Sequence, residues 1–301
     1  MKKTVLICIL TIIILAFPLK VKASDESFIF RDVFGEEYTT IIDSRIQPSP
    51  YNNALFVKNT DINTDFPANQ AVPPNQDKQL NTNNNKLYYE DDNYTSRLGI
   101  DVSHHQKGIN WNKVKEDGYS FAFLRIGYRG YGKEGSLCED KYFKKNLKEA
   151  KAAGLDVGVY FYAQAINGKE AIEEAEFVLD LLKGEALDLP VVYDPESVLD
   201  AEARTDNVSK AQFTRNTKLF CDTIKSAGYK TGIYSNMLWE AYKLDLAYLT
   251  DKLPDTLIWY ADYEEVPQTP YNFTFWQYSN TARVNGVSGE CDVDIELIRK
   301  K

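Results

Sequence analysis

The hydrophobic positions of this chain change their pattern near residue 97. From there on, short and almost continuously apolar runs alternate with segments in which apolar residues recur every three or four positions. The runs predict strands, and the periodic segments predict amphipathic helices. Eight strands are expected, at 98–102, 120–127, 156–164, 189–193, 230–234, 257–263, 273–278 and 291–297. Helices are expected at 142–153, 169–182 and 210–227, with a weaker one after residue 236.

Two of the predicted helices are followed by glycine, Gly154 and Gly228, the residue type that often ends a helix. Strands that are apolar throughout are typical of a parallel sheet covered by helices on its outer face. Eight of them in about 205 residues predict a closed α/β barrel. The last three strands are joined by connections too short for full helices. The predicted fold is therefore an irregular (β/α) barrel, TIM-barrel-like, with its last three strands poor in helix.

The beginning of the chain predicts export. Lys2 and Lys3 precede an apolar run over 5–17, which is too short to span a bilayer, and Ala23 offers a cleavage site. This layout is that of a secretory signal peptide, expected over residues 1–23. Cys8 lies inside the apolar run, which favours a cleaved, secreted product over a lipid anchor. No later segment is long and apolar enough to span a membrane, so the mature product is expected outside the cell or on the cell wall.

Residues 24–95 are expected to form an Asn/Pro-rich acidic spacer, mostly disordered. Eleven asparagines lie between Asn52 and Asn93, with few sustained apolar patterns. The less polar part, 27–46, is expected to form a short ordered element at most. The barrel domain is expected over residues 96–301.

Charge and cysteine content exclude several classes of function. Loss of residues 1–23 removes four lysines and no acids, which takes the formal charge from -9 to -13 and makes a nucleic-acid partner unlikely on electrostatic grounds. Three cysteines remain, so at most one disulfide can form. The two histidines, His104 and His105, would point to opposite faces of a strand, which argues against a zinc site. No metal or cofactor is expected.

Acidic residues stand at the ends of the predicted strands, where the chemistry of such barrels lies. Asp101 ends the first strand, Asp194 and Glu196 end the fourth, Asp262 ends the sixth, and Asp292 opens the eighth. Asp194 and Glu196 are two positions apart, so in an extended segment they share one face with Cα atoms about 6.5 Å apart. Carboxylates gathered at one mouth raise each other's pKa, so one can stay protonated while its neighbour is charged. Glycoside hydrolysis needs that division of roles.

Structural roles compete for each of these residues. A single Asp at a strand end is often a loop or helix cap, so the prediction depends on the acids converging in space. Aromatic residues near strand ends can stack on sugar rings or pack in the core. The candidates for sugar binding are Tyr160, Tyr162, Trp259 and Trp276. Arg125, on an otherwise apolar strand, is expected either to pair with one of the acids or to pack with its charged head in water.

An ordered series of motifs over residues 98–298 resembles family 25 of the glycoside hydrolases, the N-acetylmuramidase-type lysozymes. The series comprises Asp101-Val102-Ser103-His104-His105-Gln106, Ile109-Asn110-Trp111, Phe123-Leu124-Arg125-Ile126-Gly127, Gly158-Val159-Tyr160, Asp194-Pro195-Glu196, Trp259-Tyr260-Ala261, Trp276-Gln277-Tyr278 and Cys291-Asp292-Val293-Asp294. The resemblance implies an irregular barrel of five β/α units and three further strands. It also implies retaining cleavage of the β-1,4 bond from N-acetylmuramic acid to N-acetylglucosamine in peptidoglycan.

The resemblance assigns roles by position. Glu196 matches the general acid, Asp194 the neighbouring carboxylate that assists the transition state, and Asp101 and Asp292 the outer acids that bind substrate. Two positions depart from the family pattern: the third strand reads Tyr160-Phe161-Tyr162 where many members have Tyr-His-Phe, and Asp294 replaces the usual Asn.

The expected protein is thus a secreted, monomeric lysozyme whose partner is the glycan strand of peptidoglycan. One alternative is a non-catalytic peptidoglycan-binding module on the same barrel, against which the retention of all four acids argues. Another is a peptidoglycan deacetylase or peptidase, which the lack of metal-ligand spacing disfavours.

Overall fold

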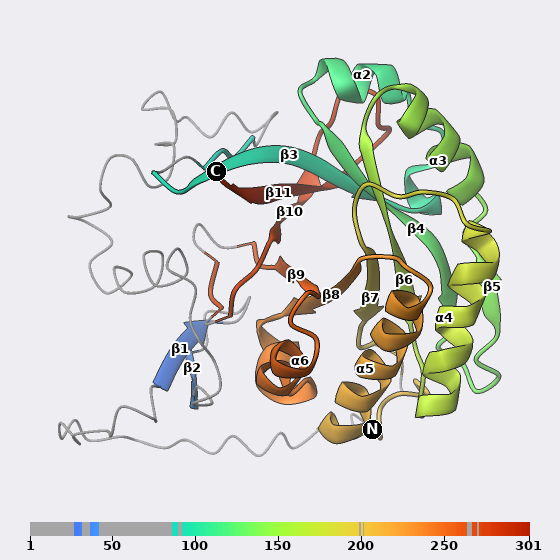
Figure 1. Ribbon diagram of the computed structural model, residues 1–301, viewed down its shortest axis with the longest axis vertical. Helices are drawn as coiled ribbons and strands as arrows, with labels where there is room; N and C mark the ends of the chain where they lie inside the picture. Colours follow the sequence, from blue (N-terminus) through green and yellow to red (C-terminus); the bar gives the residue numbers. More distant parts are fainter. Residues whose placement is uncertain are drawn as a thin grey trace, which may run out of the picture.

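A closed barrel forms the centre of the computed structural model, which describes residues 27–31, 37–41, 86–89, 92–198, 200, 202–263, 267–269 and 271–301 (Figure 1). Its order around the barrel is β3-β11-β10-β9-β8-β7-β6-β4, closed by the pairing of β4 with β3. All eight expected strands are present, and the predicted irregular α/β barrel is confirmed. Their bounds are β3 (Tyr94–Val102), β4 (Phe121–Arg129), β6 (Asp156–Ala163), β7 (Val191–Pro195), β8 (Thr231–Asn236), β9 (Leu257–Ala261), β10 (Phe275–Ala282) and β11 (Cys291–Arg299).

The last strand runs against the others. Neighbouring strands from β3 through β4, β6, β7, β8, β9 and β10 pair parallel, whereas β11 pairs antiparallel with both β10 and β3. The expectation of a parallel sheet is therefore wrong for β11. Only residues 283–290 connect β10 to β11, which is enough for a hairpin but not for a parallel crossover. As a result, the start of β11 lies at the same end of the barrel as the C-terminal ends of the other seven strands.

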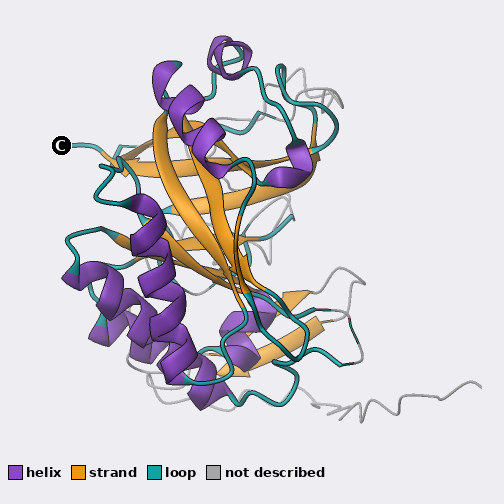
Figure 2. Cartoon of the chain, turned by 90° about the vertical axis from the view of Figure 1, so that its right-hand side faces the viewer, coloured by secondary structure: helices purple, strands orange, loops and turns teal. Residues whose placement is uncertain are grey.

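The helices gather on one side of the barrel, as Figures 1 and 2 show. The three predicted ones are present as α3 (Phe143–Ala152), α4 (Gly168–Leu182) and α5 (Lys210–Ser226). Gly154 and Gly228 follow α3 and α5 with φ of 78° and 90°, a conformation that suits glycine. The weaker helix after residue 236 is one π-helical turn, η3 (Trp239–Lys243), followed by α6 (Leu246–Lys252). The pattern missed α2 (Trp111–Glu116) and the short β5 (Leu137–Glu139), which pairs antiparallel with β4.

His104 and His105 do not lie on a strand, contrary to the expectation. Ser103 follows β3 and caps a 3-10 turn, η2 (His104–Gln106), through a capping box. The Ser103 hydroxyl accepts a hydrogen bond from the His105 N–H, and the Gln106 side chain accepts one from the Ser103 N–H. The two imidazole rings consequently lie beside each other, with centroids 4.1 Å apart.

The chain enters the barrel earlier than residue 96. Lys86 forms an ion pair with Asp117 (2.8 Å), the Leu87 N–H donates to the Tyr278 hydroxyl (3.3 Å), and Tyr89 is buried. β3 itself begins at Tyr94, so the expected boundary falls inside a strand. These contacts lie against β10 and the α2 connection, on the part of the barrel that carries few helices.

Upstream of these contacts, β1 (Ser27–Arg31) pairs antiparallel with β2 (Glu37–Ile41), inside the segment expected to form a short ordered element. The expected signal peptide and most of the expected spacer lie outside the described residues. Among the described residues, no helix combines the length and apolar character needed to cross a membrane.

Aromatic rings fill the barrel interior. Phe121, Phe123, Trp259 and Phe275 come from β4, β9 and β10 and form one buried cluster. Phe123 stacks on Trp259 with centroids 4.5 Å apart. Gly99 makes room for this cluster, because a Cβ atom there would stand 2.1 Å from the Phe121 ring. The barrel is therefore a packed core rather than a channel, and polar groups can collect only near its ends.

Candidate active site

The four acids expected to share a site converge at one end of the barrel. Asp101 lies near the end of β3, and the antiparallel register places Asp292 of β11 directly opposite it. Asp194 lies near the end of β7, and Glu196 follows that strand immediately. Asp101 and Asp194 are buried, with 4% and 5% of their surface exposed, while Glu196 and Asp292 are partly exposed. Carboxylates from three strands thus form one cluster at the mouth.

The cluster holds protons that isolated carboxyl groups would lose. Burial, and secondly the charge of Asp292, raises the pKa of Glu196 to about 7. Burial raises the pKa of Asp292 to about 6, and a hydrogen bond with Asp101 offsets part of that rise. The pKa of Asp194 lies well above its usual value because of burial and then Glu196, while Arg125 acts in the opposite direction. The mouth therefore retains at least one proton near neutral pH and can act as a general acid.

Gln277 on β10 holds Asp101 in place. Its amide Nε2 donates to Asp101 Oδ2 at 2.7 Å, and its Oε1 accepts from the hydroxyls of Tyr234 (3.0 Å) and Tyr263 (2.9 Å). From the sequence, Gln277 is part of a motif and is not a candidate site residue. The available signal was a polar residue in the middle of an apolar strand, since a buried amide there requires partners.

Asp294 is fully buried one step below the mouth. The Trp259 indole N–H donates to Asp294 Oδ1 at 2.8 Å, whereas Asp294 Oδ2 has no hydrogen-bond partner within the described part of the chain. Burial raises the pKa of Asp294 well above its usual value. Burial thus favours the protonated form of this side chain beneath the cluster, where an Asn would make a similar contact.

A family model for glycosyl hydrolases family 25 matches residues 100–287. The chain belongs to this family. It is 29% identical over 197 residues to an autolytic lysozyme of Clostridium acetobutylicum, an alignment that covers 65% of this chain and 54% of that protein. The chain thus spans about half the length of that relative.

Two solved structures are similar to this barrel. The modular autolysin LytC from Streptococcus pneumoniae, in complex with a synthetic peptidoglycan ligand, is 25% identical with a TM-score of 0.58, covering 71% of this chain and 51% of that chain. The bacterial lysozyme from Streptomyces coelicolor is 27% identical with a TM-score of 0.54, covering 66% of this chain and 90% of that chain.

In this family 25 chain, the predicted substrate-binding aromatics fall into two groups. Tyr160 and Tyr162 are partly exposed and near the acids, since the charge of Asp101 contributes to the raised pKa of Tyr160 and that of Glu196 to the raised pKa of Tyr162, after burial in both cases. Trp259 and Trp276 are enclosed, with 2% and 7% of their surface exposed. The Trp276 indole N–H donates to the main-chain oxygen of Asp262 at 2.7 Å.

Arg125 forms its ion pair with Asp140 rather than with one of the four clustered acids. Its Nε lies 3.0 Å and one terminal nitrogen 2.9 Å from Asp140 Oδ2, and the same terminal nitrogen contacts His104 Nδ1. The guanidinium also lies over the Tyr128 ring, 5.3 Å from its centroid. From the sequence, Asp140 resembles an ordinary turn residue, and its Oδ1 does accept a hydrogen bond from the Tyr142 N–H (2.9 Å) in the turn before α3.

The rim of the mouth carries exposed apolar side chains. Of the large hydrophobic residues that are exposed in the described chain, five follow the C-terminal ends of parallel strands: Tyr131, Ile166, Leu238, Tyr242 and Tyr263. Such side chains around the mouth are suited to the apolar faces of sugar rings.

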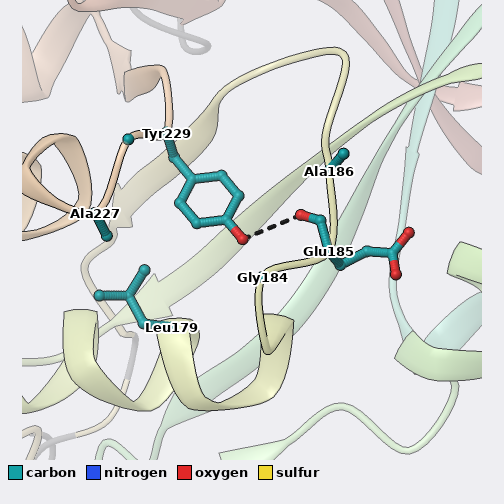
Figure 3. A pocket seen from close by; sticks show the side chains of 7 residues that line it. Leu179, Gly184, Glu185, Ala186, Ala227 and Tyr229 are labelled. Carbon is teal, nitrogen blue, oxygen red and sulfur yellow. Dashed lines mark hydrogen bonds between the residues drawn. The ribbon is translucent and has the colours of Figure 1, made fainter.

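A separate pocket of about 420 Å³ lies away from the acids (Figure 3). It is bounded by the segments that follow α4 and α5, and the Tyr229 hydroxyl donates to the main-chain oxygen of Glu185 at 3.0 Å. Its one carboxylate, Glu185, is paired with Lys151 at 2.6 Å. Within the described residues, no three His, Cys, Asp or Glu side chains are grouped as metal ligands.

Proposed function

We propose that this protein is an exported lysozyme that hydrolyses the β-1,4 bond between N-acetylmuramic acid and N-acetylglucosamine in peptidoglycan. The observation that carries the proposal is the pairing of Asp194 and Glu196 at the end of β7, facing Asp101 and Asp292 in a family 25 barrel. The names of the relatives, an autolytic lysozyme and a modular autolysin studied with a peptidoglycan ligand, support this substrate and a location at the cell wall.

We assign Glu196 as the general acid. Its pKa of about 7 leaves it about half protonated at neutral pH, so it can donate a proton to the glycosidic oxygen as the bond to the sugar breaks. Its partial exposure gives a substrate better access to the proton than to the carboxyl group of Asp194, which is 5% exposed.

We assign Asp194 to the assistance of the sugar transition state. With 5% of its surface exposed, the Asp194 carboxyl group can be reached by one donor of a bound sugar. The 2-acetamido N–H of the muramic sugar is such a donor. With Asp194 holding that group, the acetamido oxygen attacks the anomeric carbon, the leaving oxygen takes the Glu196 proton, and water activated by Glu196 then opens the cyclic intermediate with net retention.

The remaining candidates either bind substrate or support the residues that do. Asp101 and Asp292 accept hydrogen bonds from sugar hydroxyls across the mouth, Tyr160 and Tyr162 contact the sugar from β6, and Arg125 fixes the surrounding wall. Trp259 and Trp276, being enclosed, act as supports beneath these groups.

The variant Glu196→Gln tests the assignment. The amide fits the same space but cannot donate a proton to the leaving oxygen, so we expect turnover to fall by about 10²- to 10⁴-fold with substrate binding retained. Release of new reducing ends from purified peptidoglycan, with mass analysis of the fragments, reports both activity and the bond cut. Activity within a few-fold of the unmodified protein would remove Glu196 from the role. Binding without any release of reducing ends by the unmodified protein would instead favour a cell-wall-binding module.

A further inference from the structure

Gln164 follows β6 directly, is fully buried, and uses all of its polar groups. Its side-chain Nε2 donates to the main-chain oxygen of Glu196 at 2.8 Å, and its Oε1 accepts from the Thr205 hydroxyl at 3.1 Å. Its main-chain N–H donates to Glu174 Oε1 at 3.1 Å, and its main-chain oxygen accepts from Arg204 at 2.8 Å. One residue thus joins the end of β6 to α4 and to three points of the segment after β7.

The sheet itself does not hold Glu196. β7 pairs with β8 only as far as Tyr193 and with β6 only as far as Pro195, so Glu196 stands beyond the last paired residue on both sides. Pro195 has no N–H to extend the ladder. The hydrogen bond from Gln164 therefore holds the main chain at Glu196, directly after the last residue of β7 that is paired in the sheet.

The groups that hold Gln164 are themselves fixed by ion pairs. Glu174 is fully buried and accepts from Arg129 at 2.8 Å. Arg204 donates to both carboxylate oxygens of Glu170, each at 2.8 Å. Arg129 also pairs with Glu173 at 3.4 Å, so the two arginines are balanced by three glutamates. The bidentate geometry restricts rotation of the Arg204 guanidinium. Because its nitrogen meets a carbonyl and its oxygen meets a hydroxyl, the Gln164 amide is held in one orientation.

We propose that Gln164 is a positioning residue for the general acid: it fixes the peptide of Glu196 so that the carboxyl group meets the glycosidic oxygen in one orientation. The inference rests on the proposed function, because it takes Glu196 as the acid. Gln164 does not contact the substrate and acts only through Glu196. Proton transfer depends on hydrogen-bond reach, and a displacement of about 1 Å can cost roughly 10²-fold in rate.

The test compares two substrates that differ in their need for an acid. In soluble glycan strands the leaving group is a hydroxyl oxygen of the next sugar, which must be protonated as the bond breaks. The dinitrophenyl glycoside of the N-acetylglucosaminyl-N-acetylmuramic acid disaccharide releases a phenolate that leaves without a proton. A variant that misplaces the acid loses kcat/KM on the first substrate and keeps it on the second, whereas general damage to the fold lowers both.

The main variant is Gln164→Met, which keeps the side-chain length and removes the amide nitrogen and oxygen that make the two hydrogen bonds. We expect kcat/KM to fall about 10- to 100-fold on glycan strands and less than about 3-fold on the dinitrophenyl glycoside. Thr205→Val removes only the hydroxyl that orients the amide, and a smaller loss, about 3-fold, is expected with the same selectivity. Thr205→Val decides the question if Gln164→Met does not fold.

Asn216→Leu is the matched control. Asn216 is also fully buried, and its amide donates to the main-chain oxygen of Ala165, the residue next to Gln164, at 2.8 Å without reaching Glu196. Any loss in this variant should be equal on the two substrates. The proposal would be overturned if Gln164→Met lost kcat/KM equally on glycan strands and on the dinitrophenyl glycoside, or if Thr205→Val showed no difference between the two substrates. Glu196→Gln is measured alongside: if it lacks the selective loss, the assignment of the acid fails, whatever Gln164 does.

Discussion

The charge of Asp292 should set the upper pH limit of activity, and Asp292→Asn tests this. The pKa of Glu196 rises from 4.5 to about 7, with burial as the larger cause and Asp292 as the second. Asp292 therefore accounts for less than half of this rise of roughly 2.5, about 1 at most. Removing a negative charge favours ionisation of its neighbour, so the variant lowers the pKa of Glu196 to about 6.

The consequence is a shift in the pH profile rather than only a loss of rate. The acid must be protonated, so the alkaline limb of kcat/KM should fall at about pH 7 in the unmodified protein and at about pH 6 in Asp292→Asn. At pH 7 the protonated fraction drops from about one half to about one tenth. The assay is release of reducing ends from soluble glycan between pH 4 and about 9, since the midpoint of the limb is independent of any loss in substrate binding.

Glu185→Gln, at the pocket away from the mouth, serves as the control and should leave the limb in place. An alkaline limb that stays at the same pH in Asp292→Asn, or that moves upward, would refute the reasoning and assign the limb to a group other than Glu196.

Three further predictions address mechanism, stability and domain extent. Successive fluorination of the substrate's acetamido methyl group should slow turnover progressively if the acetamido oxygen attacks, whereas an unchanged rate or an ester trapped on Asp194, seen by mass spectrometry, would make Asp194 the nucleophile. Burial raises the pKa of Glu240 to about 8, so its protonated form contributes stability that is complete below the unfolded pKa near 4.5 and is lost as the pH rises toward 8. The variant Glu240→Gln should therefore flatten the decline of the melting temperature between pH 5 and 8. An equally steep decline in the variant would contradict this. A chain that begins at Lys86 should melt like one that begins at residue 24, whereas a start at Ser96 removes buried Tyr89, worth about 2 kcal/mol, and should lower the melting temperature by roughly 4–8 °C in calorimetry; equal melting temperatures would return residues 86–95 to the spacer.

The predictable part of the fold was its apolar pattern. The strand positions follow from continuous apolar runs, and Gly154 and Gly228 mark helix ends correctly, because both signals are local. The apolar run of β11 does not reveal the direction of the strand, because the run reads the same for either direction. Only the short connection from β10 decides that β11 is antiparallel. Ser103 shows another limit, since a single capping hydroxyl turned two histidines from a strand into a 3-10 turn.

The candidate site was predictable in its acids and not in its supports. Asp194 and Glu196 stand out because two carboxylates interrupt the end of an apolar strand. Gln164 and Asp140 do not stand out, because a Gln or Asp after a strand is common, and Gln277 shows only as one polar residue within an apolar strand. The partners of these three residues lie 15 to 176 positions away along the chain. Long-range hydrogen bonds of this kind are fixed by the folded barrel, so the sequence pattern alone does not contain them.

The antiparallel direction of β11 also determines where the two ends of the barrel domain lie, and so where a neighbouring segment would be attached. Because β11 runs back along β3, Arg299 pairs with Tyr94, and the Lys300 N–H donates to the Asn93 main-chain oxygen at 2.7 Å. Entry and exit of the barrel are thus adjacent, at the pole opposite the acids. A tether or further module joined at either side would leave from that pole, so the enzyme could be anchored at its back while its open mouth stays free to meet a polymer that is itself immobile.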